Sequence, residues 1–290
     1  MKRFLRCFYL MFMLAQTAQA APVQPEISWI HPDFPPYFIH NGPYAGQGTA
    51  DRIEAFLARE LPRFKHSQLR ANLVRRDLEI KSDKLACSSA MLKTPAREQT
   101  MLFSNAYTSI LPNGVIILRS KEARMLPYIN ARGELRLSQW LASAQYRLSA
   151  AAGRSFGPQI DAMLETDNQA RHVFRFKSSD SFATGLLQMQ NQQDVDGVLG
   201  YAVELSWTAR RLGLQADAFK FLPIEGATRL QPSYIGCSKS PEAAEVLKHV
   251  NALIESGKLP ELAKRAYVEW LPADAAGLFE ILYKTERHQP

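Results

Sequence analysis

Lys93-Thr94-Pro95-Ala96-Arg97-Glu98 and, shortly after it, Phe103-Ser104-Asn105-Ala106-Tyr107 occur in a chain of 290 residues. A third piece, Asp33-Phe34-Pro35-Pro36-Tyr37, lies near the start and precedes a glycine-rich turn. Each piece alone is too short to be specific. Their order and their spacing, together with the elements between them, carry the information about the fold.

The first of these elements is a short apolar run, Ile27 to Ile30, which predicts a buried strand. The proline-rich stretch after it cannot continue the strand and predicts a loop. Beyond the glycines, Ile53, Phe56, Leu57 and Leu61 are spaced as on one face of a helix, with Thr49 or Asp51 as its N-cap. The chain therefore opens as strand, loop and helix.

Strands and helices continue to alternate along the rest of the chain. Further strands are expected over 69–74, 85–92, 113–118, 146–152, 173–176, 198–199 and 218–222, with helices after Gly157 and through Leu186. An amphipathic tail covers 243–271 and is broken near Gly257 and Pro260. This alternation predicts α/β units with mostly parallel sheets.

The first residues have the pattern of a secretory signal peptide. Lys2, Arg3 and Arg6 precede an apolar run that is too short to span a bilayer, and Ala18-Gln19-Ala20 fits a cleavage site, so residues 1–20 are expected to be removed. This segment carries three positive charges and no negative ones, so its loss lowers the formal net charge from +7 to +4. The remaining basic residues are scattered, which argues against a nucleic-acid partner.

Residue types that hold metals or cofactors are not grouped in this chain. The six histidines are dispersed, and there is no phosphate-binding loop, no zinc motif and no dinucleotide fingerprint, so no metal or cofactor is expected. Export would leave two cysteines, Cys87 and Cys237. An oxidising compartment permits a disulfide between them, and two buried free thiols are the alternative.

One enzyme motif is present. Gly153-Arg154-Ser155-Phe156-Gly157 fits Gly-x-Ser-x-Gly between an expected strand and an expected helix, and Asp217 and His249 follow in an order that a serine hydrolase would accept. The alternative is a loop that leads into a helix N-terminus, where free backbone N–H groups can hold an anionic ligand.

The three quoted pieces closely resemble the family 3 bacterial solute-binding proteins, the extracytoplasmic receptors of polar amino acid transporters. In that family the corresponding segments are a proline-aromatic loop, Thr-Pro-Glu-Arg and Phe-Ser-x-Pro-Tyr. Asp196-Gly197-Val198-Leu199 and the tail from Asn251 to Trp270 extend the resemblance over nearly all of the chain after residue 20.

The resemblance implies a two-lobed periplasmic-binding fold of type II, with mixed sheets flanked by helices and two hinge crossovers. Lobe 1 would contain 21–112 and 235–290, and lobe 2 would contain 113–234, with crossovers near 110–116 and 229–236. In such a fold Cys87 and Cys237 would lie on neighbouring segments of lobe 1, which favours a disulfide between them.

The resemblance also implies a ligand site between the lobes. Arg97 would bind a carboxylate, because its planar guanidinium can donate two parallel hydrogen bonds to that group, unless it pairs with Glu98 or Asp77 instead. Thr94 would either donate to the ligand beside Arg97 or cap the following turn. Phe34 and Tyr37 would form flat apolar walls unless they are ordinary core residues.

The sequence departs from the family pattern at several positions. Ala90 and Leu92 stand where amino acid receptors have glycine and threonine, so one carboxylate donor is missing. Tyr201 stands where they have an aspartate for the ligand's ammonium group, and Glu204 replaces that charge only if its helix turns it inward. Phe156 and Tyr201 add aromatic surface, which suits a solute with a ring or an apolar body and one anionic group.

The sequence therefore predicts an extracytoplasmic, periplasmic protein that captures an anionic or zwitterionic, amino acid-like solute and passes it to an ABC permease or a membrane sensor. It is expected to be a monomer and not an enzyme. The alternatives are a secreted enzyme on the same scaffold, either a hydrolase through Ser155 or a cyclic-acid dehydratase, and a purely structural envelope protein.

Overall fold

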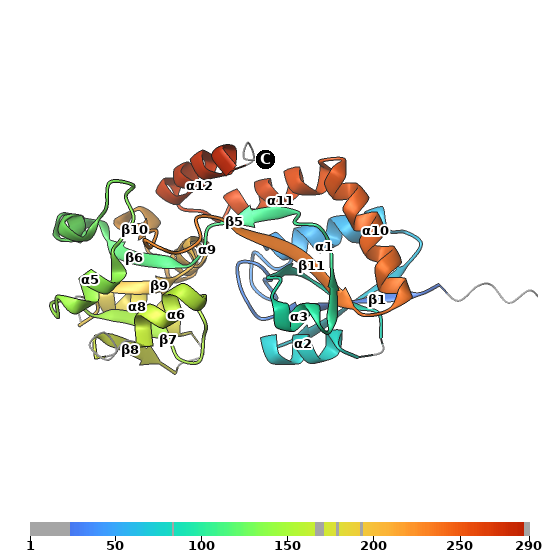
Figure 1. The fold of residues 1–290 in the computed structure, drawn as a ribbon, viewed down its shortest axis with the longest axis horizontal. Coiled ribbons are helices and arrows are strands. Elements are labelled where there is room, and N and C mark those ends of the chain that lie inside the picture. Colours follow the sequence, from blue (N-terminus) through green and yellow to red (C-terminus); the bar gives the residue numbers. More distant parts are fainter. Residues whose placement is uncertain (1–23, 83, 166–170, 178–179, 192–193, 287–290) are drawn as a thin grey trace, which may run out of the picture.

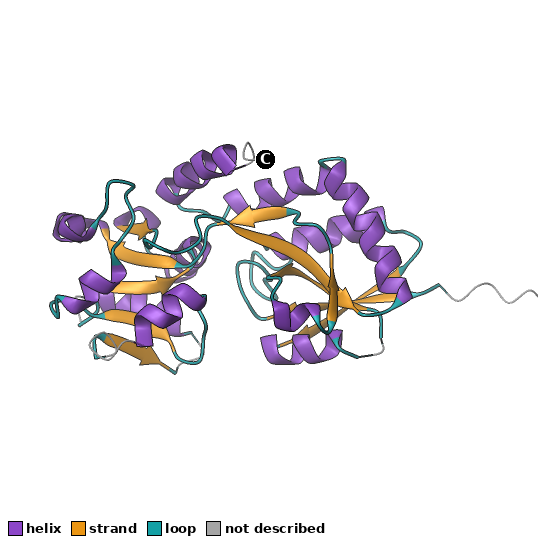
Figure 2. Cartoon of the chain, viewed as in Figure 1, coloured by secondary structure: helices purple, strands orange, loops and turns teal. Residues whose placement is uncertain are grey.

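The protein consists of two α/β lobes that lie side by side (Figure 1). The structure is a computed structural model, and it describes residues 24–286 except 83, 166–170, 178–179 and 192–193. The predicted signal peptide lies outside the described residues. Each lobe is built around one sheet with helices on its faces (Figure 2).

The first sheet has six strands in the order β2-β1-β3-β11-β4, with β5 paired to β11. β1 is parallel to β2 and β3, whereas β11 is antiparallel to β3, β4 and β5. The strands are β1 (Glu26–Pro32), β2 (Lys65–Ala71), β3 (Ala86–Met91), β4 (Met101–Phe103), β5 (Thr108–Ile110) and β11 (Gln231–Ser238).

The second sheet has five strands in the order β10-β6-β9-β7-β8. β7 is parallel to β8 and β9, and β6 is antiparallel to β9 and β10. Both sheets are thus mixed rather than mostly parallel. The strands are β6 (Gly114–Leu118), β7 (Leu148–Ala151), β8 (Val173–Phe176), β9 (Gly197–Gly200) and β10 (Phe219–Leu222).

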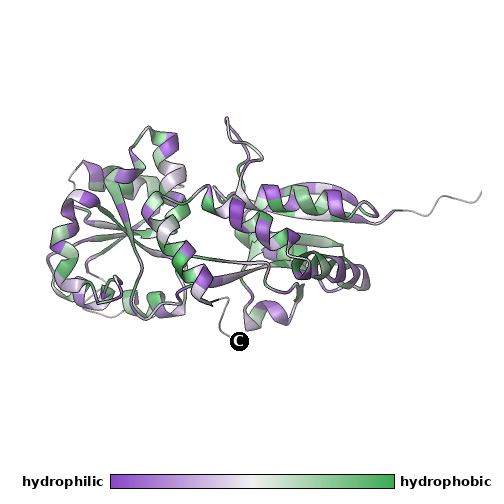
Figure 3. Ribbon diagram, turned by 90° about the horizontal axis from the view of Figure 1, so that it is seen from above, coloured by the Kyte–Doolittle hydropathy of each residue, from purple (hydrophilic) through white to green (hydrophobic). Residues whose placement is uncertain are grey.

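Helices cover both sheets, and many of them alternate between hydrophobic and hydrophilic residues, as expected for helices with one buried face (Figure 3). In the first lobe these are α1 (Thr49–Glu60), α2 (Leu73–Ile80), α3 (Pro95–Glu98), α10 (Pro241–Glu255) and α11 (Lys258–Val268). Lobe 2 contains α4 (Glu122–Met125), α5 (Leu137–Ala142), α6 (Pro158–Glu165), α8 (Ser181–Gln190) and α9 (Ala202–Leu212), with short 3₁₀ turns η1 (Arg119–Lys121), η2 (Leu126–Tyr128) and η3 (Ala216–Ala218).

The chain crosses between the lobes twice. It leaves the first sheet after β5, enters the second at β6, and returns between β10 and β11. The two-lobed α/β fold that the sequence predicts is therefore confirmed. The residue boundaries of the lobes stay a prediction.

The last helix, α12 (Ala273–Glu286), contacts both lobes. In the first lobe it contacts α11, where Phe279 packs on Tyr267 with ring centroids 5.2 Å apart and Glu280 pairs with Lys264 at 2.8 Å. In the second lobe α12 packs against β10, and the Asp274 carboxylate accepts a hydrogen bond from the Arg119 guanidinium at 3.2 Å. This helix therefore bridges the two lobes.

Two local expectations were wrong. The strand expected over 69–74 ends at Ala71, because the Asn72 side chain accepts from the Arg75 N–H and caps α2 at that point. The N-cap of α1 is Gly48, not Thr49 or Asp51. Asp51 instead lies inside the first turn, where its carboxylate accepts from the Gly48 N–H at 3.0 Å.

Cys87 and Cys237 form a disulfide in the structure. They are directly opposite each other on the neighbouring strands β3 and β11 of the first sheet. The bond closes a loop that contains the whole second sheet.

None of the helices in the described part of the chain has both the length and the apolar character needed to cross a bilayer.

Candidate functional site between the lobes

A pocket of about 530 Å³ lies between the two lobes. The first lobe contributes the loop after β1, with Asp33, Phe34 and Pro35. The second lobe contributes the end of β7 with the loop after it, the start of α8, and one face of α9 from its first turn to its last. Its lining residues there are Ala151, Ala152, Arg154, Asp180, Ser181, Phe182, Glu204, Trp207, Thr208 and Arg211. Parallel strands that end at one edge commonly build ligand pockets in this way.

Arg154 is the central charged residue of this pocket. Its Nη1 and Nη2 donate to the two carboxylate oxygens of Glu204 at 2.7 and 2.8 Å, and Nη2 also donates to Asn113 Oδ1 at 3.1 Å. The guanidinium also lies 5.2–5.4 Å from the ring centroids of three aromatic residues, which are Phe34, Phe156 and Tyr201. These contacts are favourable cation–π geometry in a largely desolvated place.

The electrostatics keep this arginine charged. Burial by itself lowers the pKa of Arg154, but the charge and hydrogen bonds of Glu204 outweigh burial and hold that pKa above its ordinary value. Three of the five N–H groups of the guanidinium donate to Glu204 and Asn113. The other two, on Nε and Nη1, have no acceptor in the described part of the chain. They remain available to an anionic group.

Local sequence explains why Glu204 faces inward. It is the third residue of α9, and its carboxylate also accepts from the Tyr201 N–H at 2.8 Å, so it closes the first turn of the helix. A Cβ at Gly200 would collide with the ring of Phe182 and approach Glu204 Oε2 to 3.1 Å, so only glycine lets these side chains close up. Glu204 is 7% exposed, and the inward orientation considered from the sequence is the one present.

The first lobe supplies two stacked rings. Phe34 and Tyr37 lie nearly parallel with centroids 5.5 Å apart, and Tyr201 meets both of them edge-on at 6.2 and 6.3 Å. Tyr37 is 4% exposed, and its hydroxyl has no hydrogen-bond partner among the described residues. Burial raises the pKa of Tyr37 well above its ordinary value, so the hydroxyl stays neutral.

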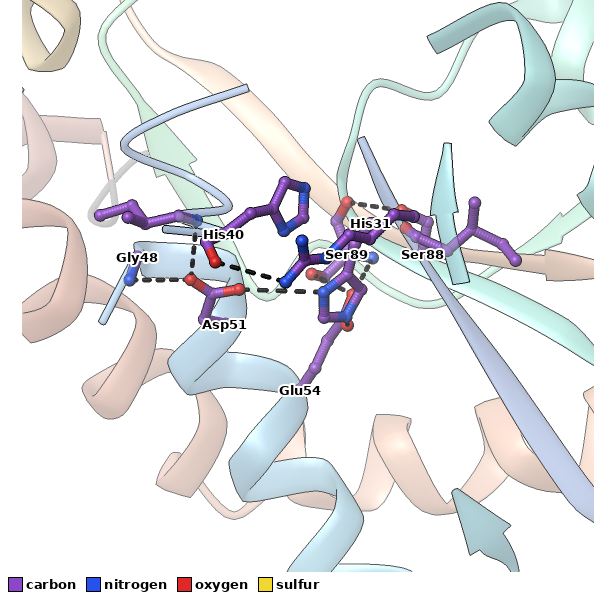
Figure 4. A network of polar contacts seen from close by, with 10 residues as sticks. His31, His40, Gly48, Asp51, Glu54, Ser88 and Ser89 are labelled. Atoms are coloured by element: carbon purple, nitrogen blue, oxygen red, sulfur yellow. Dashed lines mark hydrogen bonds and ion pairs between the residues drawn. The ribbon is translucent and has the colours of Figure 1, made fainter. Parts of the chain in front are cut away.

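A buried polar network ties the loop after β1 to the rest of the first lobe (Figure 4). His31 Nε2 lies 2.5 Å from Glu54 Oε2, and the other Glu54 oxygen accepts from the N–H and the hydroxyl of Ser89. Asp51 accepts from the Ile39 and Gly48 N–H groups. The network therefore joins the end of β1, the following loop, α1 and the end of β3.

Four predicted ligand residues lie from the end of β3 into α3. They are Ala90, Leu92, Thr94 and Arg97. Arg97 donates to Asp77 Oδ2 from Nε and Nη2 and to the Leu92 carbonyl from Nη1, at 3.0–3.2 Å. The Thr94 hydroxyl accepts from the Arg97 N–H as the N-cap of α3. Ala90 has φ +53° and donates its N–H to the Tyr107 hydroxyl. None of these four lines the interlobe pocket, and their role in binding stays a prediction.

Ser155 is not paired with a histidine in the described part of the chain. Its hydroxyl donates to Asp161 Oδ2 at 2.5 Å, and the same carboxylate accepts from the Phe156 N–H. His249 lies on α10 of the other lobe, where its Nδ1 contacts the Glu245 carbonyl. The Gly-x-Ser-x-Gly segment thus forms a loop whose polar groups are tied to the first turn of α6.

The structure places Phe34, Tyr37, Phe156, Tyr201 and Glu204 close to one another, and their role in binding stays a prediction. The sequence analysis did not single out Arg154 or Asn113. Arg154 is the unremarked second residue of the quoted Gly-x-Ser-x-Gly motif. Its partner Glu204 is fifty residues away, and no local pattern links the two. Only the presence of one basic residue beside the expected helix N-terminus could have drawn attention to it.

No protein-family model and no curated protein sequence matches the chain. Solved structures do match. A "probable amino-acid ABC transporter extracellular-binding protein ytmK" from Bacillus subtilis is 16% identical with a TM-score of 0.59, covering 85% of this chain and 98% of its own. An ancestral cationic amino acid solute-binding protein has 14% identity and a TM-score of 0.61, covering 86% and 96%. A Streptococcus pneumoniae ABC uptake transporter substrate-binding protein with bound histidine has 17% identity and a TM-score of 0.57, covering 85% and 94%. The chain therefore has the two-lobed fold of the periplasmic binding proteins.

Proposed function

We propose that this protein is an extracytoplasmic solute-binding protein that closes its two lobes on a small anionic or zwitterionic solute. The observation that carries the proposal is the convergence of both lobes on one pocket. Asp33 and Phe34 come from the first lobe, and Arg154, Glu204 and Trp207 come from the second. A solute held by both sets would favour the closed arrangement, because it would contact both sets only when the lobes meet.

Arg154 is the better candidate for the anionic group of the solute. Arg154 lines the pocket between the lobes, whereas Arg97 does not and donates from its guanidinium to Asp77 and to the Leu92 carbonyl. Glu204, already paired with Arg154, would still be able to receive an ammonium group at the pocket edge.

The partner is expected to be a membrane component, either an ABC permease or a sensor. Two of the similar structures named above are described as binding proteins of ABC transporters, which supports a permease. A periplasmic location after cleavage at Ala20 and a monomeric state complete the proposal.

Thermal unfolding against amino acids, small carboxylates and aromatic acids tests this proposal. A solute at 100 times its dissociation constant should stabilise the protein by about 2.7 kcal/mol, which shifts the melting temperature by several degrees. Arg154→Gln should abolish the shift, and the matched variant Arg97→Gln should largely keep it. Loss of the shift in Arg97→Gln alone would return the carboxylate site to Arg97. No shift with any compound would refute the proposal.

A serine hydrolase remains the second candidate only because of the loop around Ser155. Its hydroxyl is committed to Asp161. Ser155→Ala should therefore keep solute binding, and neither protein should turn over ester substrates. Ester hydrolysis that disappears in Ser155→Ala would establish the enzyme instead.

A further inference from the structure

A second pocket, of about 460 Å³, lies beside the interlobe pocket and also has walls from both lobes. The loop after β1 provides Phe38, Ile39, Pro43 and Tyr44, and α9 provides Trp207. Both volumes fall within the range of about 300–1,000 Å³ that is usual for small-molecule sites.

The two pockets are neighbours that share part of their lining. Asp33, Pro35, Trp207 and Arg211 line both of them. A solute in the first pocket can therefore extend past these residues into the second without leaving the space between the lobes.

The two pockets differ in character. The first contains Arg154, Glu204 and Asp180, whereas the second is lined mainly by apolar and aromatic side chains. The cation specific to the second pocket, Arg210, lies 4.6 Å from the Trp270 ring centroid and donates to the Glu269 carbonyl. Its charge is therefore already engaged within the protein. The aromatic lining of the pocket is Tyr44 and Trp207, and the buried Trp270 packs behind both rings.

We infer that the cleft takes an amphipathic solute larger than a small amino acid, with its charged head beside Arg154 and its apolar body in the second pocket. This inference rests on the proposed function and specifies the class of solute. The charged first pocket would orient the head. Apolar area removed from water in the second pocket would supply affinity that increases with the length of the body.

A homologous series tests the inference. The probes are the straight-chain α-amino acids from 2-aminobutanoate to 2-aminodecanoate and, in parallel, the straight-chain carboxylates from butanoate to decanoate. Calorimetric titration of the secreted protein should show affinity rising by up to roughly fourfold per methylene in at least one series, until the pocket is filled.

Variants locate the chain of the probe. Asn41 and Pro43 are exposed and line only the second pocket, so Asn41→Trp should fill it and Pro43→Arg should place a charge in it. Both should lower the affinity of the longest bound probe about tenfold or more and leave the shortest unchanged. Ala45→Trp, which introduces the same side chain on the same loop but outside the pocket lining, should have no effect.

The outcomes separate the inference from the proposed function. Short probes that bind without any gain from added methylenes would overturn the inference and leave the proposed function standing. A gain that persists in both Asn41→Trp and Pro43→Arg, each folded as the wild type is by its melting temperature, would also overturn the inference. Absence of binding by every probe, together with a negative library screen, would overturn both.

Discussion

His31 and Glu54 form a buried hydrogen bond in the first lobe. Their side chains are 3% and 2% exposed, and Asp51 Oδ1 lies 3.9 Å from His31 Nδ1. Burial and the charge of nearby Arg70 lower the pKa of His31. The hydrogen bond and charge of Glu54, together with the charge of Asp51, outweigh them, so the pKa is raised above 6.5. The folded protein therefore binds the proton of His31 more tightly than the unfolded chain does.

The raised pKa of His31 predicts how stability depends on pH. A group whose pKa is higher in the folded state stabilises fully below its unfolded pKa and loses that contribution as pH rises through the folded value. The free energy of unfolding should therefore fall as pH rises above 6.5. Urea unfolding between pH 6 and pH 9 measures the slope.

Two variants identify the residue responsible for that slope. Glu54→Gln removes the main influence that raises the pKa of His31. Burial, which lowers that pKa, would then be opposed mainly by the charge of Asp51, so the dependence of stability on pH should flatten or reverse. His31→Gln should remove the contribution of this group and lower stability at pH 6, since Glu54 is left without its charged partner. An unchanged slope in both variants would assign it to other groups.

At the scale of elements, the pairing of β3 with β11 fixes the return of the chain to the first lobe. Cys87 and Cys237 join these strands across 150 positions of sequence. Because the second lobe lies inside this loop, the bond restricts the unfolded chain strongly, whatever the strands contribute by packing.

Removing the disulfide should therefore be costly. Cys87→Ala with Cys237→Ala should lower the free energy of unfolding by about 5 kcal/mol, the chain-entropy value for a loop of this length. Urea denaturation with and without a reducing agent measures the change. Reduction should destabilise the wild type and leave the double variant unaffected, and a wild type insensitive to reduction would contradict a disulfide.

At the scale of the molecule, local sequence predicted the elements better than it predicted the site. The β-branched run in β6 and the break at Gly257 depend only on neighbouring residues, and both were predicted from them. α2 was missed because Leu73, Val74 and Leu78 are exposed, so its apolar residues do not mark a buried face. With α2 missed, its Asp77 could not be placed beside Arg97, although that pairing was considered.

The packing of the two lobes on each other also depends on contacts far apart in sequence. One continuous group of buried residues includes Tyr37 and Phe38 of the first lobe, Leu186 and Phe219 of the second, and Phe279 of α12. The signature of α12 in the sequence is only an apolar stretch after Leu271, and nothing local indicates that it bridges both lobes. A core shared in this way favours unfolding of the lobes as one unit.

Because α12 bridges the two lobes, substitutions in this helix test that cooperativity. Phe279→Ala removes a fully buried ring that packs on Tyr267, and it should lower the free energy of unfolding by about 3–5 kcal/mol. Ile281→Ala on the same helix is the matched control, because Ile281 is 65% exposed and should change stability by less than about 0.5 kcal/mol. Differential scanning calorimetry should show one transition for the wild type and the control. Two separate transitions in the wild type would mean that the lobes are stabilised independently and that α12 does not couple them.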